Sequence, residues 1–179
     1  MKIILISFFS LITSLHAQNL IENLQFSDSE ADVFNKLEAN PRIKSTHRKT
    51  IFGSFGSNGM YKTKASIQGL HFSFHFSFSN NKKSVEQMSL LSDPQSSYTE
   101  KFKATWQESH NLLSAIYGKA AMVNSIPPKH KLNKGSHLCN NLWRLQNNRA
   151  AMLGVKLTND GKYQIVILFL PKMPRMQQL

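Results

Sequence analysis

The chain has 179 residues, and its apolar share of 41% is enough for one domain with a buried core. It carries 22 Lys and Arg against 10 Asp and Glu, and this net charge of +12 favours anionic partners over cationic ones. The single cysteine, Cys139, excludes an intramolecular disulfide. We expect its thiol to be half-buried and free, with an intermolecular disulfide as the alternative.

The first 17 residues have the pattern of a secretory signal peptide. Lys2 precedes an apolar run from Ile3 to Leu15, and Ala17 is the small residue after which we expect cleavage. The run is shorter than the roughly 20 residues that a transmembrane helix needs. We therefore expect an exported protein, periplasmic or extracellular, whose residues 18–179 form a single α+β domain without a transmembrane segment. An uncleaved anchor is the alternative.

The first helix is predicted after a short leader over residues 18–25. Ser27 and Glu30 have the spacing of a capping box, in which each side chain satisfies a backbone N–H of the other residue. An apolar stripe begins at Val33, and Pro41 ends the helix.

Three strands are predicted next. Residues 53–59 are glycine-rich, and we interpret them as a hairpin loop because no helix follows to hold a phosphate. Residues 60–67 and 84–91 are the outer strands, and residues 70–78 are the middle one. In the middle strand Phe alternates with Ser and His from Phe72 to Phe78, so one face is aromatic and the other polar.

The polar face of this strand is the predicted partner-binding surface. It faces away from the aromatic side, which we expect to be covered by the helices. No acidic residue occurs between Pro41 and Ser84, so the surroundings are basic. The candidate residues are His71, Ser73, His75 and Ser77, with Lys62 and Lys64 from the preceding strand.

The second half repeats the order of elements. Ser97 and Glu100 suggest another capping box, and a helix with an apolar stripe follows until Gly118. Residues 119–141 are expected to form a long loop. Strands are predicted at 142–146, 150–157 and 163–170, with a tight turn at 158–161 and a loose tail from Met173.

The order of elements predicts two αβββ units, over residues 26–92 and 97–171. They would form one antiparallel sheet of about six strands, with both helices packed on one face. The phenylalanine strand would supply the floor beneath those helices.

Two motifs carry a resemblance to known proteins. The first is Ser27-x-x-Glu30-x-x-Val33-x-x-x-Leu37-x-x-x-Pro41, and the second is Leu113-x-x-x-Tyr117-Gly118-Lys119 followed by the strand with Trp143. This arrangement resembles the tandem αβ fold of the β-lactamase inhibitor proteins and the single-unit small lipoprotein of the outer-membrane barrel-assembly machine. The resemblance implies protein binding through the exposed sheet face, without chemistry. The lipoprotein's anchoring cysteine and an inhibitor's disulfides are absent, so no contact residues are carried over.

Candidate catalytic and metal-binding groups are sparse. His71 and His75 are about 13 Å apart along a strand, too far to share one ion unaided. His130, His137 and Cys139 form a second candidate group, with His110 as the nearest fourth ligand. No Ser occurs at a strand-to-helix elbow, and no acidic pair suggests hydrolysis.

We therefore predict an exported, non-catalytic domain without a cofactor. Its partner would be a protein or an anionic envelope component, bound through the basic sheet face. The alternatives are a metal-dependent or hydrolytic enzyme that uses the exposed histidines, and a polyanion-binding protein. Nucleic acid is disfavoured, because export removes the protein from most cellular nucleic acid, and Trp106 and Trp143 are expected in the core.

Overall fold

A computed structural model describes residues 24–39, 54–55, 60–67, 69–81 and 83–174 of the chain. For residues 54–55 and 60–67 the description is limited to the backbone. The predicted signal peptide, the connection at 40–52 and part of the glycine-rich loop lie outside these residues.

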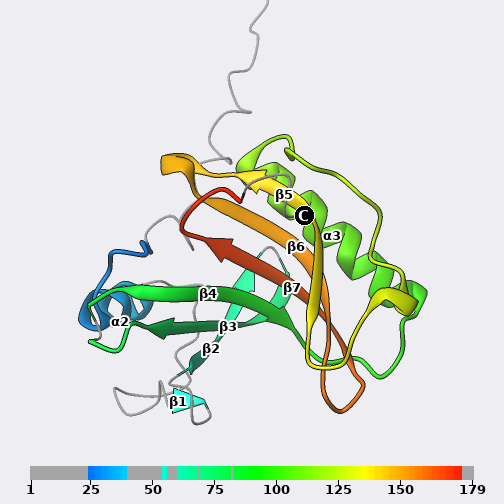
Figure 1. The fold of residues 1–179 in the computed structure, drawn as a ribbon, viewed down its shortest axis with the longest axis horizontal. Coiled ribbons are helices and arrows are strands. Elements are labelled where there is room, and N and C mark those ends of the chain that lie inside the picture. The colour runs from blue at the N-terminus through cyan, green and yellow to red at the C-terminus, as the bar shows by residue number, and fades with distance from the viewer. Residues whose placement is uncertain (1–23, 40–53, 56–59, 68, 82, 175–179) are drawn as a thin grey trace, which may run out of the picture.

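The described residues form two α-helices and one antiparallel sheet of seven strands, which confirms the α+β class. The strand order across the sheet is β1-β2-β3-β4-β7-β6-β5 (Figure 1). The elements are α2 (Glu30–Glu38), β1 (Ser54–Phe55), β2 (Met60–Ile67), β3 (Leu70–Phe78), β4 (Val85–Ser92), α3 (Glu100–Tyr117), β5 (His137–Arg144), β6 (Ala150–Leu157) and β7 (Tyr163–Leu170).

The aromatic side of β3 is buried beneath the helices, as its alternating pattern predicted. Phe72, Phe74 and Phe76 are 4%, 2% and 0% exposed. The ring of Phe34 from α2 packs edge-on against Phe76 and Phe78, with centroids 6.3 and 6.2 Å apart. These aromatic contacts fix α2 over the β3 side of the sheet.

Helix α3 packs on the same side of the sheet, over the strands of the second half. Phe102 and Trp106 of α3 join the same core cluster as Trp143 of β5 and Ile167 of β7. Trp106 is 4% exposed and Trp143 is fully buried, so both tryptophans are core residues as expected. Figure 1 shows α2 and α3 toward opposite ends of the sheet.

Two antiparallel meanders meet at the centre of the sheet. One runs β2-β3-β4 and the other β5-β6-β7, and their last strands pair with each other. Met88 lies opposite Phe169 and Leu91 opposite Val166 at this junction. The junction therefore brings residues 75 to 81 positions apart in sequence into one continuous sheet.

The helix caps differ from the predicted ones by two residues in both halves. Ser29, not Ser27, caps α2, and its capping-box partner is Asp32. Thr99, not Ser97, caps α3 by accepting a hydrogen bond from the Phe102 N–H. Asp28 is engaged elsewhere, which moves the start of α2 to Glu30.

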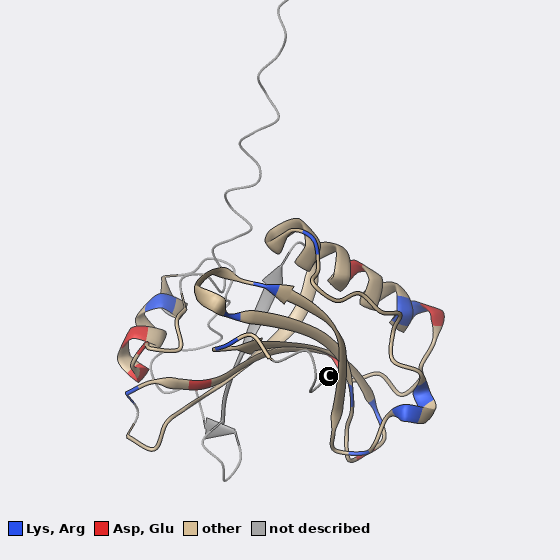
Figure 2. Cartoon of the chain, turned by 45° about the horizontal axis from the view of Figure 1, so that its top comes forward, with Lys and Arg blue, Asp and Glu red and all other residues tan. Residues whose placement is uncertain are grey.

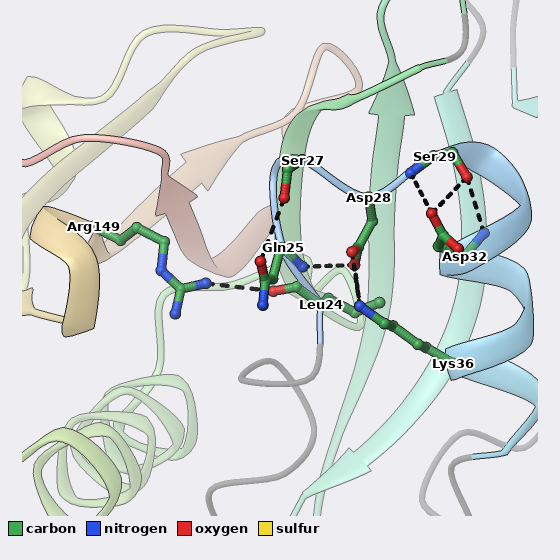
Figure 3. Close-up of polar contacts among 8 residues, drawn as sticks. All are labelled: Leu24, Gln25, Ser27, Asp28, Ser29, Asp32, Lys36 and Arg149. Atoms are coloured by element: carbon green, nitrogen blue, oxygen red, sulfur yellow. Dashed lines mark hydrogen bonds and ion pairs between the residues drawn. The ribbon is translucent and has the colours of Figure 1, made fainter.

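The expected leader also differs, because its end is anchored. Leu24 is 2% exposed in the core, and its carbonyl accepts a hydrogen bond from the Arg149 guanidinium at 3.4 Å. The buried Asp28 carboxylate accepts hydrogen bonds from the Gln25 N–H at 2.7 Å and from Lys36 at 2.7 and 2.8 Å (Figure 3). The Arg149 contact ties the segment before α2 to the second half of the chain, and the Asp28 contacts tie it to α2.

The loop predicted over residues 119–141 ends earlier in the structure than expected. Strand β5 starts at His137, five positions before the expected start at Leu142. A register shift between Cys139 and Asn141 interrupts its alternation, and this bulge hides the strand pattern in the sequence. Met173, expected in a loose tail, packs against the sheet, and its N–H donates to the Asn148 carbonyl at 2.6 Å.

Candidate functional site: the helix-free face

The candidate site is the side of the sheet opposite α2 and α3, called the helix-free face. Cross-strand register and side-chain alternation assign residues to it. They are His71, Ser73, His75 and Ser77 of β3, Gln87, Ser89 and Leu91 of β4, Gln164, Val166, Leu168 and Leu170 of β7, Ala150, Met152, Gly154 and Lys156 of β6, and His137, Cys139, Leu142 and Arg144 of β5.

The β3 and β4 part of the helix-free face is polar. His71 is exposed, whereas Ser73, His75 and Ser77 are half-buried. His75 lies opposite Ser89, and Ser77 lies opposite Gln87. Ser and His therefore alternate along β3, and the neighbouring row of β4 contributes the exposed Gln87 and the buried Ser89.

The two predicted lysines lie beside this polar part by register. The Cα atom of Lys62 pairs with that of His75, and Lys64 pairs with Ser73. Cross-strand partners share one face of a sheet, so β2 extends the same polar rows. The structure thus brings four of the six predicted site residues into two neighbouring rows. Ser77 lies in the next row, opposite Gln87, and His71 lies toward the other end of β3, opposite Ser66.

The β5–β7 part of the helix-free face is apolar. Leu142, Ala150 and Met152 form a buried cluster with the half-buried Met122, Cys139, Leu168, Leu170 and Met173. We call Met122, Met152 and Met173 with their neighbours Leu142, Leu168 and Leu170 the methionine cluster. None of these residues belongs to a helix, so the cluster is separate from the core beneath α2 and α3.

Two methionines reach the cluster from outside the sheet. The carbonyl of Met122 accepts a hydrogen bond from the Leu142 N–H at 3.0 Å, which places this segment along the edge of β5. Asn141 reinforces the contact, because its side-chain oxygen accepts the Asn124 N–H at 2.7 Å. Backbone hydrogen bonds therefore fix Met122, while its flexible thioether remains half-buried at the surface.

Basic side chains border the apolar part. Arg144 is exposed opposite Ala150, and the half-buried Lys156 lies between His137 and Gln164. Partial burial and then the positive charge of Lys156 lower the pKa of His137. Strands β5, β6 and β7 contain no acidic residue, and Asp160 in the β6–β7 turn pairs with Lys162 at 2.9 Å. Figure 2 shows that the red acidic segments lie mainly on the two helices.

Cys139 is a free, half-buried thiol, as the sequence predicted. Its sulfur lies against β6 at Gly154, where an added Cβ would clash with it. Burial raises the pKa of the Cys139 thiol to about 12. The sulfur therefore acts as a small apolar group in the wall of the helix-free face.

The histidines and the cysteine do not gather into a metal centre within the described part of the chain, where no group of three or more His, Cys, Asp and Glu side chains could hold an ion. His130 is exposed on a short 3-10 helix, whereas His137 and Cys139 lie on β5. His110 packs edge-on against Trp143 with ring centroids 5.2 Å apart. The loop that was expected to bring His130, His137 and Cys139 together is thus partly a strand.

A separate cleft of about 590 Å³ opens on the helix side of the sheet. It lies between α3 and the turn that precedes β3, and is lined by Gly69, Leu70, Glu108, Asn111, Leu112 and Ala115. None of the predicted site residues lines it.

The methionine cluster was missed from the sequence. Both sides of β6 and β7 are apolar, so their alternation does not tell which residues face away from the helices. The available signal was the acid-free stretch from Ser109 to Asn159. It indicated a basic region, but it did not indicate which residues share a surface.

No family model, curated protein or solved structure matches this chain. The resemblance to the β-lactamase inhibitor proteins stays a prediction. No helix in the part of the chain that the structure describes is long and apolar enough to cross a membrane.

Proposed function

We propose that the chain is an exported, non-catalytic binding domain that recognises an acidic protein, or another anionic envelope component, through its helix-free face. The observation that carries this proposal is the composition of that face. It joins a polar Ser and His surface to three acid-free strands and is bordered by Arg144 and Lys156.

The distribution of charge supports an anionic partner. Five of the ten acidic residues lie on α2 and α3, which cover the opposite side of the sheet, whereas β5, β6 and β7 contain none (Figure 2). The acid-free strands β5, β6 and β7, with Arg144 and Lys156, therefore favour the approach of an anionic partner to the helix-free face.

We also propose that the domain consists of two αβββ units. Helices α2 and α3 each begin with Glu directly after a hydroxyl-bearing cap, at Glu30 and Glu100. Helix α2 precedes the meander β2-β3-β4, which has the two-residue strand β1 at its edge, and α3 precedes the meander β5-β6-β7. The two meanders pair through β4 and β7. This arrangement supports two αβββ units that share one sheet. It also agrees with protein binding through the exposed face, which the resemblance implies.

Catalysis by the histidines is the weaker alternative. The residues opposite His75 are Lys62 and Ser89, and the residue opposite His71 is Ser66. Lysine and serine are not the ligands that zinc sites use, so the neighbouring strands do not complete a metal site around either imidazole. Activity lost in His71→Ala and His137→Ala variants would favour this alternative.

Capture from envelope extract tests the proposal. We expect the mature chain, beginning at Gln18, to recover a partner at low salt and to lose it at high salt, because salt screens exposed charges. Arg144→Glu with Lys156→Glu should reduce recovery by about tenfold, since like charges would then face an acidic surface.

The matched control reverses two exposed lysines outside the helix-free face, Lys101→Glu and Lys119→Glu. It changes the net charge equally and should leave recovery unchanged. Equal losses in both variants would show that net charge, not the helix-free face, attracts the partner. Retention on heparin in place of a protein partner would favour the polyanion-binding alternative.

A further inference from the structure

We infer that the methionine cluster is the docking surface for a partner segment that combines a bulky apolar side chain with flanking acidic residues. The inference rests on the proposed function and specifies its partner. The partner's apolar side chain would contact Met122, Met152 and Met173, and the partner's acidic residues would contact the basic residues around them.

The cluster is accessible at its rim. Met122, Met173 and Leu168 are half-buried, whereas Met152 beneath them is 6% exposed. The cluster therefore has a buried floor and a partly exposed rim. An apolar group that covers the rim would remove further apolar surface from water, which favours binding.

Methionine is the side chain suited to this use. It is unbranched, and its polarisable sulfur adapts to apolar groups of different shape. Three methionines on one surface would accept Leu, Phe or Met from a partner without a preformed, rigid pocket. Backbone hydrogen bonds hold the main chain at Met122 and Met173, so only the side chains need to adjust.

The basic residues beside the cluster indicate that the residues flanking the partner's apolar side chain are acidic. Arg144 is exposed two positions from Leu142 of the cluster, and the exposed Lys172 directly precedes Met173. No acidic side chain of the described residues forms an ion pair with Arg144 or Lys172. Both residues lie at the end of the strands where Arg144 pairs with Ala150 and Ala150 with Leu170. A carboxylate beside an apolar anchor would therefore meet guanidinium and ammonium groups there.

Titration with synthetic peptides, followed by NMR of methionine methyl groups labelled with ¹³C, tests the inference on the mature chain. The probes are a peptide with a leucine–phenylalanine pair between glutamates, an all-glutamate peptide of equal length, and the same apolar pair between lysines. We expect the first probe to bind about tenfold more tightly than the second, which is about 1.4 kcal/mol. The third should not bind.

The methyl signals report the place of binding. Those of Met122, Met152 and Met173 should shift with the first probe, while that of Met88, which is 1% exposed on the helix side, should not. Met122→Ser and Met173→Ser should each weaken binding by several-fold. Val123→Ser is the matched control, because Val123 is 60% exposed beside Met122 but outside the cluster, and it should bind as the unchanged protein does.

Two results would overturn the inference in distinguishable ways. In the first result, the first two probes bind equally well, Arg144→Glu abolishes their binding, and the methyl signals of the cluster do not move. The proposed function would then stand, but the methionine cluster would have no part in it. No binding of either glutamate-containing probe would contradict both.

Discussion

At Gly154 the backbone of β6 lies close against β5. A Cβ atom there would lie 2.6 Å from the Leu138 carbonyl oxygen and 2.8 Å from the Cys139 Cα atom, so the obstruction includes backbone. We expect Gly154→Ala to lower the free energy of unfolding by about 1–3 kcal/mol, measured by urea denaturation, because a packed sheet must shift to admit the methyl group.

The thiol of Cys139 provides a control for this prediction. Cys139→Ala removes the sulfur but leaves the Leu138 carbonyl in place, so it should not restore the stability of Gly154→Ala. Full restoration would show that the sulfur alone sets the spacing between β5 and β6.

Cys139 should also be chemically inert in the folded protein. Its pKa of about 12, against an ordinary 9.0, leaves about a thousandfold less thiolate near neutral pH. A disulfide reagent should therefore label the native protein far more slowly than the unfolded chain. Labelling at similar rates would contradict a buried thiol.

The raised pKa of Cys139 also predicts how the stability of the folded protein changes with pH. The folded state holds the thiol proton more tightly than the unfolded state does. The resulting stability is present below pH 9.0 and is lost as the pH rises toward about 12. Cys139→Ala should reduce this alkaline loss of stability.

At the scale of elements, the helix caps allow the sharpest comparison. Ser29→Ala removes the acceptor for the Asp32 N–H, and Thr99→Ala removes the acceptor for the Phe102 N–H. Each should lower the free energy of unfolding by about 1 kcal/mol, measured in urea. Ser27→Ala and Ser97→Ala, the caps predicted from the sequence, are the matched controls and should have little effect.

The cap of α2 should weaken in acid. Hydrogen bonds from the Ser29 hydroxyl and N–H lower the pKa of Asp32 from its ordinary 3.8. The folded state therefore binds the proton less tightly, and this contribution to stability is present above pH 3.8 and lost below it. An effect of Ser29→Ala that is unchanged by acid would contradict a role for the Asp32 carboxylate.

The sequence predicted regular elements better than their ends. The alternation of Phe with Ser and His placed β3 at its observed residues, and β6 and β7 also begin and end where expected. The α2 cap was wrong because Ser27-x-x-Glu30 and Ser29-x-x-Asp32 offer competing capping boxes. The choice depends on Asp28, whose ion pair with Lys36 only the folded chain reveals. β5 was shortened because a bulge breaks its period.

At the scale of the whole molecule, pairing of β4 with β7 makes one continuous helix-free face from two parts of the chain. The polar part was predictable, because β3 carries its pattern in one continuous stretch. The apolar part depends on which side of β6 and β7 the helices cover and on the long-range placement of Met122 and Met173. Neither feature can be predicted from the local alternation of apolar and polar residues.

Site-specific photo-cross-linking in the producing cell tests the central claim, that the helix-free face contacts the partner. A photoreactive residue would replace Ser73 or Ser77 on β3, and Gln107 or Asn111 on the exposed side of α3 as the matched controls. We predict a cross-linked partner from the two β3 positions and none from the two α3 positions. Cross-links that form from α3 and not from β3 would contradict the claim.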